Sequence, residues 1–403
     1  MTTGSSGGDA RIRSFGASGA EAGAVRDAPN RDELIALGLL DPTSPDAVDR
    51  ERLVKFLLAR GATLEELERS RSLADLVNIS IEQALRPGPR MTRREVSWRS
   101  NLDDDLLVRL RQAMGLPDPG PRTPMYTEAD VQAARSFERL ALVFSEAVAL
   151  QLMRVAGTAV ARIAEAAVSA FMVNVDAPLR AVDNDEIAIE RAFAEVVGVL
   201  PDLGRTLDVQ LRHHIEAAVH QYSLTSRHSE AADLVSVTVG FVDLVDSTMW
   251  AAGLSPSHHA AALQVFTALA GDTIAFHNGR MVKLIGDEVM FVAADPNDAC
   301  AIALAIVDRC NEMHELPAVR AGLASGDVIS RDGDYHGAVV NLASRLVKCA
   351  DPGAVAVSRS CASSAAAAGR NDVVFRSDGV RYLRGFEEPI EMVTLLRRRM
   401  RAA

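Results

Sequence analysis

Six polar residues in the C-terminal part of the chain have the types and spacing for chemistry on a nucleotide. They lie in three short blocks, 239–248, 282–291 and 334–345. The residues are Asp243, Lys283, Asp287, Asp334, Asn341 and Arg345. A pair of carboxylates suits a divalent metal ion, a Lys/Asp pair suits the edge of a purine, and an Asn/Arg pair suits a ribose and a phosphate. Together the blocks predict a site for a nucleoside triphosphate.

The two carboxylates Asp243 and Asp287 are the candidate metal ligands. Asp243 ends an apolar, strand-like segment, and the residues after it enter a helix. Such a turn directs free backbone N–H groups outward, which suits phosphate, and a carboxylate there could hold Mg²⁺ or Mn²⁺ beside it. Asp287 lies in a predicted hairpin turn that a sheet could place next to Asp243. A lone Asp in either place is ordinarily a solvated turn or cap residue, so the prediction depends on the pair.

Lys283 and Asp334 form a donor and acceptor pair that matches adenine, which offers an acceptor at N1 and a donor at N6. Guanine reverses both groups, so a buried charge would face the wrong partner. Asn341 and Arg345 are four residues apart on a predicted helix and therefore share one face. Asn could orient the ribose, and Arg could neutralise negative charge that develops on a phosphate. Taken singly, each of these residues is more often a surface charge or an exposed helix position.

The remaining composition bounds the class of protein. A chain of 403 residues favours two or more domains, and 48% hydrophobic with 24% charged residues is typical of a soluble globular protein. The net charge of −11 argues against a general nucleic-acid or anionic-membrane surface. Four widely spaced cysteines favour reduced thiols in a cytoplasmic protein. The longest stretch free of Asp, Glu, Lys and Arg that we find, 247–271, contains Pro and His, so no membrane span is expected.

The chain divides into four segments by composition and periodicity. Residues 1–28 are rich in Gly, Ser and Ala and are expected to be disordered. Residues 29–185 have a helical period and predict an all-α regulatory domain, and 186–231 predict a helical linker. Residues 232–400 alternate strands with helices, which favours an α+β fold. The segments expected to position the six residues are strands at 235–243, 280–285, 289–294 and 319–329 and a helix at 337–350.

The three blocks resemble the catalytic domain of class III nucleotidyl cyclases, through FVDLVDST, KLIGDEV and DYHGAVVNLASR. The resemblance implies a ferredoxin-like α+β domain with a mostly antiparallel sheet and helices. It implies that ATP is converted to cyclic AMP and pyrophosphate, with two Mg²⁺ or Mn²⁺ ions in each active site. In the resemblance, the metal ligands are Asp243 and Asp287, the adenine contacts are Lys283 and Asp334, and the catalytic pair is Asn341 and Arg345.

The resemblance also implies a symmetric homodimer in which each pocket is shared. The metal carboxylates would come from one subunit, and the other four residues from its partner. Arg384, in YLRGFEEP, resembles a late basic residue of the family that lies near the phosphates. One departure is Tyr335-His336, where many relatives have a Trp before the Gly.

The N-terminal part resembles the helical regulatory domain of certain bacterial class III cyclases, some of them pH-sensing. RREV, LRQAMGLP, YTEAD and AGTAVARIAEAA carry this resemblance, over 31–180. A competing interpretation is a DNA-binding helix-turn-helix at 91–116, but its arginines are balanced by Glu95 and the acidic run 103–105. No nucleic-acid partner is therefore expected.

Four histidines lie in or beside the predicted linker helix: His213, His214, His220 and His228. Histidine changes charge between about pH 5 and pH 8, so these residues form a candidate pH switch that shifts the helix between two packings. The alternative is that they are solvated side chains on an exposed face.

Other functions stay open at this point. A guanylyl cyclase is disfavoured by Lys283 and Asp334, and a diguanylate cyclase would carry a double Gly where this chain has IGDEV. A catalytically silent nucleotide-binding or dimerisation module would be free to lose the six polar residues, yet all are present. A DNA-binding regulator would have to use 91–116.

Overall fold

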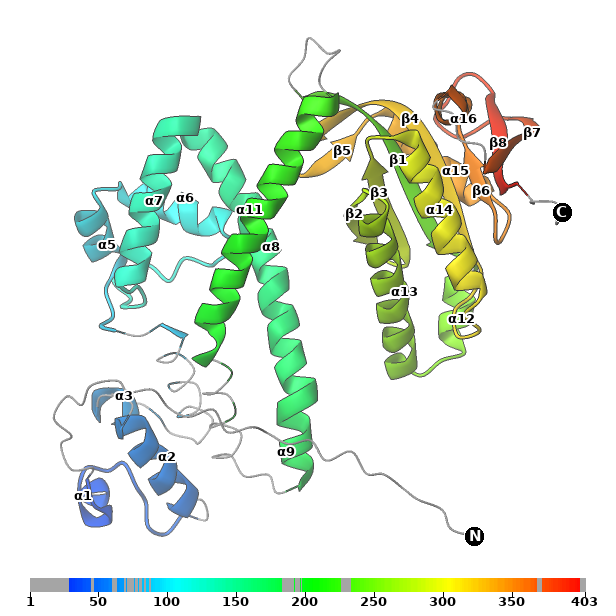
Figure 1. The fold of residues 1–403 in the computed structure, drawn as a ribbon. Coiled ribbons are helices and arrows are strands. Elements are labelled where there is room, and N and C mark those ends of the chain that lie inside the picture. The colour runs from blue at the N-terminus through cyan, green and yellow to red at the C-terminus, as the bar shows by residue number, and fades with distance from the viewer. Residues whose placement is uncertain are drawn as a thin grey trace, which may run out of the picture. The chain divides into compact units, whose positions relative to one another are not determined.

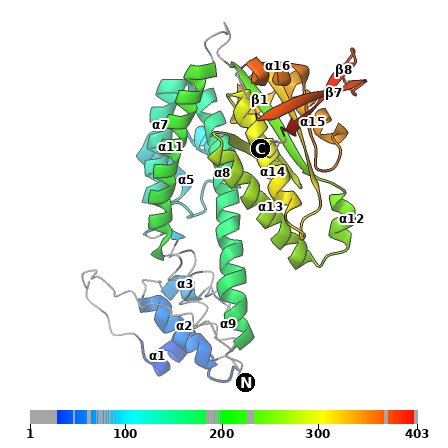
Figure 2. The same ribbon diagram turned by 45° about the vertical axis from the view of Figure 1, so that its right-hand side comes forward.

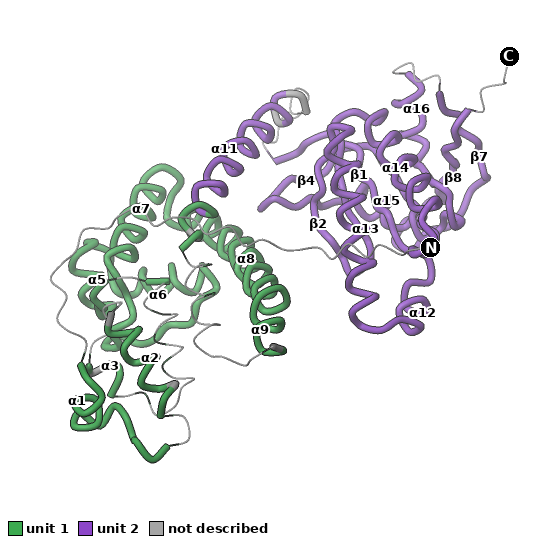
Figure 3. The backbone as a smooth tube through the Cα atoms, turned by 60° about the horizontal axis from the view of Figure 1, so that its bottom comes forward, with its two compact units in different colours: residues 1–203 green, residues 204–403 purple. Residues whose placement is uncertain are grey.

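The computed structural model describes residues 29–44, 47–59, 64–68, 88–182, 198–225, 233–367 and 372–398, with isolated positions between 70 and 86 and at 192 and 196. The chain separates into two compact units, Met1–Leu203 and Gly204–Ala403 (Figure 3). The segment 1–28, predicted to be disordered, lies outside the described residues. The division falls inside helix α11 (Leu200–Thr225), which is the described part of the predicted linker. The predicted domain borders stay predictions.

The described elements of the first unit are helical, apart from a single β-bridge between Met91 and Tyr126 (Figure 1). The elements are α1 (Arg31–Ala36), α2 (Ala47–Ala59), α3 (Leu64–Glu68), α5 (Arg93–Ser100), α6 (Asp104–Ala113), α7 (Glu128–Phe144), α8 (Glu146–Phe171), the π-helix Met172–Asp176 and α9 (Ala177–Val182). They bury two apolar clusters. One contains Leu34, Leu53 and Leu57 on α1 and α2, and the other contains Val131 and Phe137 on α7. The predicted all-α character is confirmed for these residues.

Residues 127–171 have a helical period, and Thr127 followed by Asp130 matches a capping box, so the sequence favours one long helix that starts at this point. The structure has two helices here, α7 and α8. The start of α7 is as predicted, because the Thr127 N–H donates to the Asp130 carboxylate at 2.7 Å in a capping box. The break is at Ser145, whose φ of 74° lies outside the helical region. The sequence contains no Gly or Pro at this point, so the pattern alone predicted a continuous helix.

Residues Glu146–Ala181 form one helical stretch that is long and apolar enough to cross a membrane by length and composition. Only 6% of the most apolar part of this stretch is buried. Arg154, Arg162 and Glu165 interrupt this segment, so it contains no long charge-free stretch from which a span could be predicted. The charge-free stretch 247–271 lies instead in α12 (Ser247–Ala252) and α13 (Pro256–Phe276).

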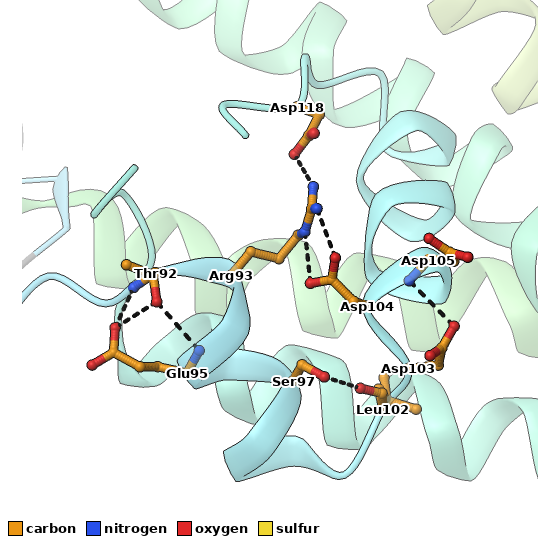
Figure 4. A network of polar contacts seen from close by, with 9 residues as sticks. All are labelled: Thr92, Arg93, Glu95, Ser97, Leu102, Asp103, Asp104, Asp105 and Asp118. Atoms are coloured by element: carbon orange, nitrogen blue, oxygen red, sulfur yellow. Dashed lines mark hydrogen bonds and ion pairs between the residues drawn. The ribbon is translucent and has the colours of Figure 1, made fainter. Parts of the chain in front are cut away.

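A buried arginine holds the start of α5 to the start of α6 and to the loop after α6 (Figure 4). Arg93 donates from Nε and Nη2 to the two carboxylate oxygens of Asp104, at 2.9 and 2.7 Å, and from Nη1 to Asp118 at 2.7 Å. The hydrogen bond from Arg93 is the largest influence on the pKa of Asp104 and of Asp118, and it lowers both. Arg93 lies in the segment of the helix-turn-helix interpretation, but it is buried and paired with these two carboxylates.

We predict that Arg93→Met destabilises the first unit by about 2 kcal/mol, because two carboxylates lose charge-assisted hydrogen bonds. The sign of the pH dependence follows from the lowered pKa values. The stability that Arg93 adds to the wild type is complete above the unfolded pKa of about 3.9 and is lost as pH falls through the lowered folded pKa values of Asp104 and Asp118. Urea unfolding at pH 7 and pH 3 checks this: the difference in free energy of unfolding between variant and wild type should be smaller at pH 3 than at pH 7. An equal difference at both values would contradict it.

The second unit is built on one eight-stranded sheet. Its strands are β1 (Leu234–Leu244), β2 (Arg280–Ile285), β3 (Glu288–Ala293), β4 (Val319–Arg331), β5 (Asp334–His336), β6 (Val355–Val357), β7 (Val373–Arg381) and β8 (Ile390–Arg397). Its remaining helices are α14 (Pro296–Asn311), α15 (Ala338–Cys349) and α16 (Arg359–Ala367). The strand order is β2-β3-β1-β4-β6-β8-β7, with β5 paired to β4. All pairings are antiparallel except β4 with β6.

The helices cover the two faces of this sheet unequally (Figures 1 and 2). Helices α13, α14 and α16 contribute to one apolar cluster, with residues such as Phe266, Ile302 and Cys361, and α15 contributes Ala343 and Leu346 to the other. The prediction of an α+β domain with a mostly antiparallel sheet, preceded by helices, is therefore confirmed.

Helix α15 lies directly on β4 because Gly322 has no side chain. A Cβ at Gly322 would stand 2.2 Å from the backbone nitrogen of Val347 and 2.6 Å from the carbonyl oxygen of Ala343. Both are backbone atoms that cannot rotate away. The glycine thus fixes the distance from the sheet to the helix that carries Asn341 and Arg345.

Candidate active site

Asp243 is a buried carboxylate held by two cations. On β1 it lies opposite Glu288 on β3 and Arg320 on β4, so both neighbouring strands place a charged residue beside it. Arg320 donates to Oδ2 from Nε at 3.0 Å and from Nη2 at 2.7 Å. Lys348, from the last turn of α15, donates to Oδ1 at 2.8 Å. A carboxylate so deeply buried is stable in its charged form only with such partners.

Asp287 and Glu288 follow Gly286 in the turn from β2 to β3. Gly286 has a φ of 66°, the left-handed conformation that glycine adopts most readily. Glu288 is buried, and its Oε1 has no hydrogen-bond partner among the described residues. Burial raises the pKa of Glu288, the nearby positive charge of Lys348 opposes this, and the negative charges of Asp243 and Asp287 add to it. The structure thus brings both predicted metal ligands within electrostatic reach of one buried glutamate.

The chemistry of these donors fits a divalent cation. Within the described parts of the chain, no group of three His, Cys, Asp or Glu residues is arranged to hold a metal ion. Two carboxylates would therefore need further oxygen ligands, and Mg²⁺ is commonly bound by one or two carboxylates together with substrate phosphates. The buried Glu288 Oε1 has no hydrogen-bond partner among the described residues and lies 3.6 Å from the Lys348 ammonium, so it is a further oxygen at the same place.

Lys283 and Asp334 form an ion pair across β2 and β5. The Tyr335 N–H also donates to Asp334 at 2.8 Å. Burial would raise the pKa of Asp334, but the hydrogen bonds from Lys283 and Tyr335 outweigh it and lower that pKa. A second contact joins the same strands, because the Arg280 guanidinium lies 5.1 Å from the centre of the Tyr335 ring. The predicted base-reading pair is therefore assembled within one chain, in a charged and partly accessible position.

Asn341 and Arg345 lie one turn apart on α15, and both are exposed. The opposite face of the helix is buried through Ala343, Leu346 and Val347, as its apolar spacing predicts. The two polar side chains therefore project from a helix that is firmly packed on the sheet.

Arg384 is exposed in the turn between β7 and β8. Of the four linker histidines, His213, His214 and His220 are exposed on α11, and His228 lies outside the described residues. The functional roles given to these residues stay predictions.

The sequence reasoning missed Arg320, Lys348 and Glu288. Glu288 had a signal, since it is a charged residue that opens an apolar strand directly after Asp287. Lys348 lies three residues after Arg345, so it shares the helix with the candidate catalytic pair. Arg320 had no local signal, because only the β1–β4 register places it beside Asp243.

Two family profiles match the chain, one for each half. Residues 32–215 match the adenylate cyclase regulatory domain. Residues 229–397 match the adenylate and guanylate cyclase catalytic domain, which contains all six predicted polar residues.

Relatives match most of the chain. An uncharacterised protein of Mycobacterium tuberculosis is 32% identical over 332 residues, which cover 82% of this chain and 85% of that protein. An adenylate cyclase of Streptomyces coelicolor is 32% identical over 270 residues, covering 66% of this chain and 70% of that protein. A pH-sensitive adenylate cyclase of M. tuberculosis is 29% identical over 341 residues, covering 83% of each.

Among solved structures, an adenylyl cyclase from P. aeruginosa is 22% identical and covers 41% of this chain and 96% of that chain, with a TM-score of 0.37. The identity of 32% extends over 85% of one relative and over 70% of an adenylate cyclase. The chain therefore belongs to the class III cyclase family, in the group that joins an adenylate cyclase regulatory domain to a cyclase catalytic domain.

Proposed function

We propose that this protein is an adenylyl cyclase that converts ATP to cyclic AMP and pyrophosphate in pockets shared by two copies of the chain. The observation that carries the proposal is the preformed Lys283–Asp334 pair, in the same unit as a buried Asp243 whose carboxylate is paired with Arg320 and Lys348. Relatives named adenylate cyclase support the choice of substrate. The four cysteines form no disulfide, and three of them are buried, which fits a protein of the reducing cytoplasm.

Asp243 and Asp287 would hold two Mg²⁺ or Mn²⁺ ions. When bound, the ions lower the pKa of the attacking 3′-hydroxyl and neutralise the triphosphate. Asp243 contributes a carboxylate whose orientation Arg320 fixes from the neighbouring strand. Asp287 contributes a second carboxylate from the hairpin turn. Glu288 adds a third carboxyl group beside them, with its Oε1 3.6 Å from the Lys348 ammonium.

Lys283 and Asp334 would recognise adenine by opening their ion pair around the base edge. Lys283 donates to N1, and Asp334 accepts from the N6 amino group. The hydrogen bond from the Tyr335 N–H keeps Asp334 oriented while Lys283 changes partner. Guanine presents a donor and an acceptor in the opposite order, so both protein groups would face a like partner.

Asn341 and Arg345 would act on the ribose and the α-phosphate. Asn341 orients the ribose so that the 3′-oxygen can attack, and Arg345 stabilises charge that develops on the phosphate. Both project from α15 of one subunit toward the carboxylates of its partner. Arg384 would add positive charge near the departing pyrophosphate. A symmetric dimer follows, because each chain carries both halves of a pocket.

The direct test incubates the purified full-length protein with ATP and Mn²⁺ and measures cyclic AMP by chromatography. Formation of cyclic AMP, and its loss when a chelator removes the metal, is the expected result. A DNA-shift assay with the same preparation tests the regulator alternative. No cyclic AMP from a folded protein at any metal concentration would favour a catalytically silent nucleotide-binding module.

A substitution in the adenine pair should change substrate choice. We expect Lys283→Ala to lower kcat/KM for ATP by about 100-fold, because a charged hydrogen bond to the base is lost. The kcat/KM for GTP, which should be smaller than that for ATP in the wild type, should change much less. Lys55→Ala is the matched control, since Lys55 also forms an ion pair, with Glu51 in the first unit. Equal losses for both nucleotides would contradict base recognition by Lys283.

The histidines of α11 are proposed to make the activity depend on pH. The relative that is named a pH-sensitive adenylate cyclase supports this choice of signal. Replacing His213, His214, His220 and His228 by Gln should flatten the activity profile between about pH 5 and pH 8. His258→Gln on α13 is the control, because this histidine is also exposed. A profile that keeps its shape in the fourfold variant would reject the switch.

A further inference from the structure

The ammonium group of Lys348 stands between two buried carboxylates. Its Nζ is 2.8 Å from Asp243 Oδ1 and 3.6 Å from Glu288 Oε1. The Asp243 side chain is 5% exposed and the Glu288 side chain 11% exposed. Two such charges side by side repel each other strongly in a poorly solvated place, so a cation between them stabilises the folded chain.

The two cations on Asp243 hold it in different ways. Arg320 directs two N–H groups to the same oxygen, Oδ2, and its Nη1 also reaches the Lys348 carbonyl oxygen at 3.4 Å. The Arg320 side chain is 22% exposed, and Arg320 lies directly opposite Asp243 on the neighbouring strand β4. This fork geometry is rigid and orients the carboxylate.

Lys348 is the exchangeable partner. It contacts only the second oxygen, Oδ1, through a single flexible side chain that is 46% exposed. It lies in the last turn of α15, so rotation of its side chain can carry the ammonium into solvent without moving the helix. Oδ1 is thus the oxygen of Asp243 that can be released to another cation, while Oδ2 stays bound to Arg320.

We propose that Lys348 is an intramolecular competitor for the divalent cation: its ammonium occupies Asp243 Oδ1 and must withdraw before an ion binds there. The inference rests on the proposed role of Asp243 as a metal ligand. Lys348 then stabilises the metal-free protein and weakens its apparent affinity for the ion, because part of the binding free energy is used to displace it. A lysine with a purely structural role would have the opposite signature, since its loss would loosen the carboxylates and weaken ion binding.

The test compares wild type with Lys348→Gln and with Arg397→Gln, a control that removes one positive charge from a surface pair with Asp308 in the same unit. Mn²⁺ alone is titrated into the full-length proteins, and free Mn²⁺ is measured by electron paramagnetic resonance. We expect Lys348→Gln to lower the apparent Kd for Mn²⁺ by roughly fivefold, the effect of an ion pair of ordinary strength. Arg397→Gln should leave it unchanged. Without metal, the unfolding midpoint of Lys348→Gln should lie below that of wild type.

Two further results decide the inference. The gain in Mn²⁺ affinity should disappear in Asp243→Asn/Lys348→Gln, because the competition is for the Asp243 oxygen. An unchanged or higher Kd in Lys348→Gln would overturn the competition, even if wild type makes cyclic AMP from ATP and the proposed function stands. A tighter Kd in a protein that makes no cyclic AMP would support the competition and reject the proposed function instead.

Discussion

Replacing Asp243 by asparagine is expected to reduce cyclic AMP formation by a factor of about 1,000 or more. Asparagine keeps the size and one oxygen of the side chain but removes the charge that would bind a divalent ion. The loss should appear mainly in kcat, because the carboxylate acts on the reacting hydroxyl and phosphate and leaves the base contacts intact. Steady-state kinetics over a range of ATP and Mn²⁺ concentrations measure it, and added metal should not restore the rate.

The structure also predicts what Asp243→Asn does to stability, which must be separated from the effect on catalysis. Arg320 and Lys348 would both face a neutral amide, so the second unit should lose about 1–3 kcal/mol. The variant must still unfold cooperatively above the assay temperature for the kinetic result to count. Asp308→Asn, which alters only a surface pair with Arg397, is the matched control and should remain fully active. More than a tenth of wild-type activity in folded Asp243→Asn would contradict the metal role.

The elements around the candidate site were predictable because their residues follow simple periods. The alternation in 235–243 and the apolar runs beside Gly286 predicted β1, β2 and β3 within one or two residues. The apolar spacing in 337–350 predicted α15 and its buried face. Each of these elements can be predicted from one short stretch of sequence, because the spacing of its apolar residues matches the period of a strand or of a helix.

The partners of Asp243 could not be predicted in this way. Arg320 and Lys348 lie 77 and 105 residues further along the chain, and they meet Asp243 only through the β1–β4 register and the packing of α15 at Gly322. A shift of one residue in that register would turn Arg320 to the other face of the sheet. The break at Ser145 also could not be predicted, because the sequence has no Gly or Pro there to indicate the positive φ.

Mixing two inactive variants should restore activity if the pockets are shared between subunits. Asp243→Ala and Asn341→Ala should each be inactive as homodimers. Random pairing makes about half of the dimers mixed, and each mixed dimer has one pocket with both residues intact, so about a quarter of wild-type activity is expected. Co-expression of the two chains with different affinity tags, followed by purification on both tags in turn, isolates the mixed dimer and should raise this to about half.

The choice of partner variant makes this experiment specific. Asp243→Ala should also be rescued by Arg345→Ala, because Arg345 lies on the same helix face as Asn341 and would serve the opposite pocket. It should not be rescued by Asp287→Ala, because Asp287 directly precedes Glu288, which lies opposite Asp243 in the β1–β3 register, and the two carboxylates would belong to the same half-site. If the pocket were built within one chain, none of these mixtures would recover activity. Rescue by Asn341→Ala and Arg345→Ala without rescue by Asp287→Ala would show that one subunit supplies the metal-binding carboxylates of a pocket. The partner would supply the residues on α15.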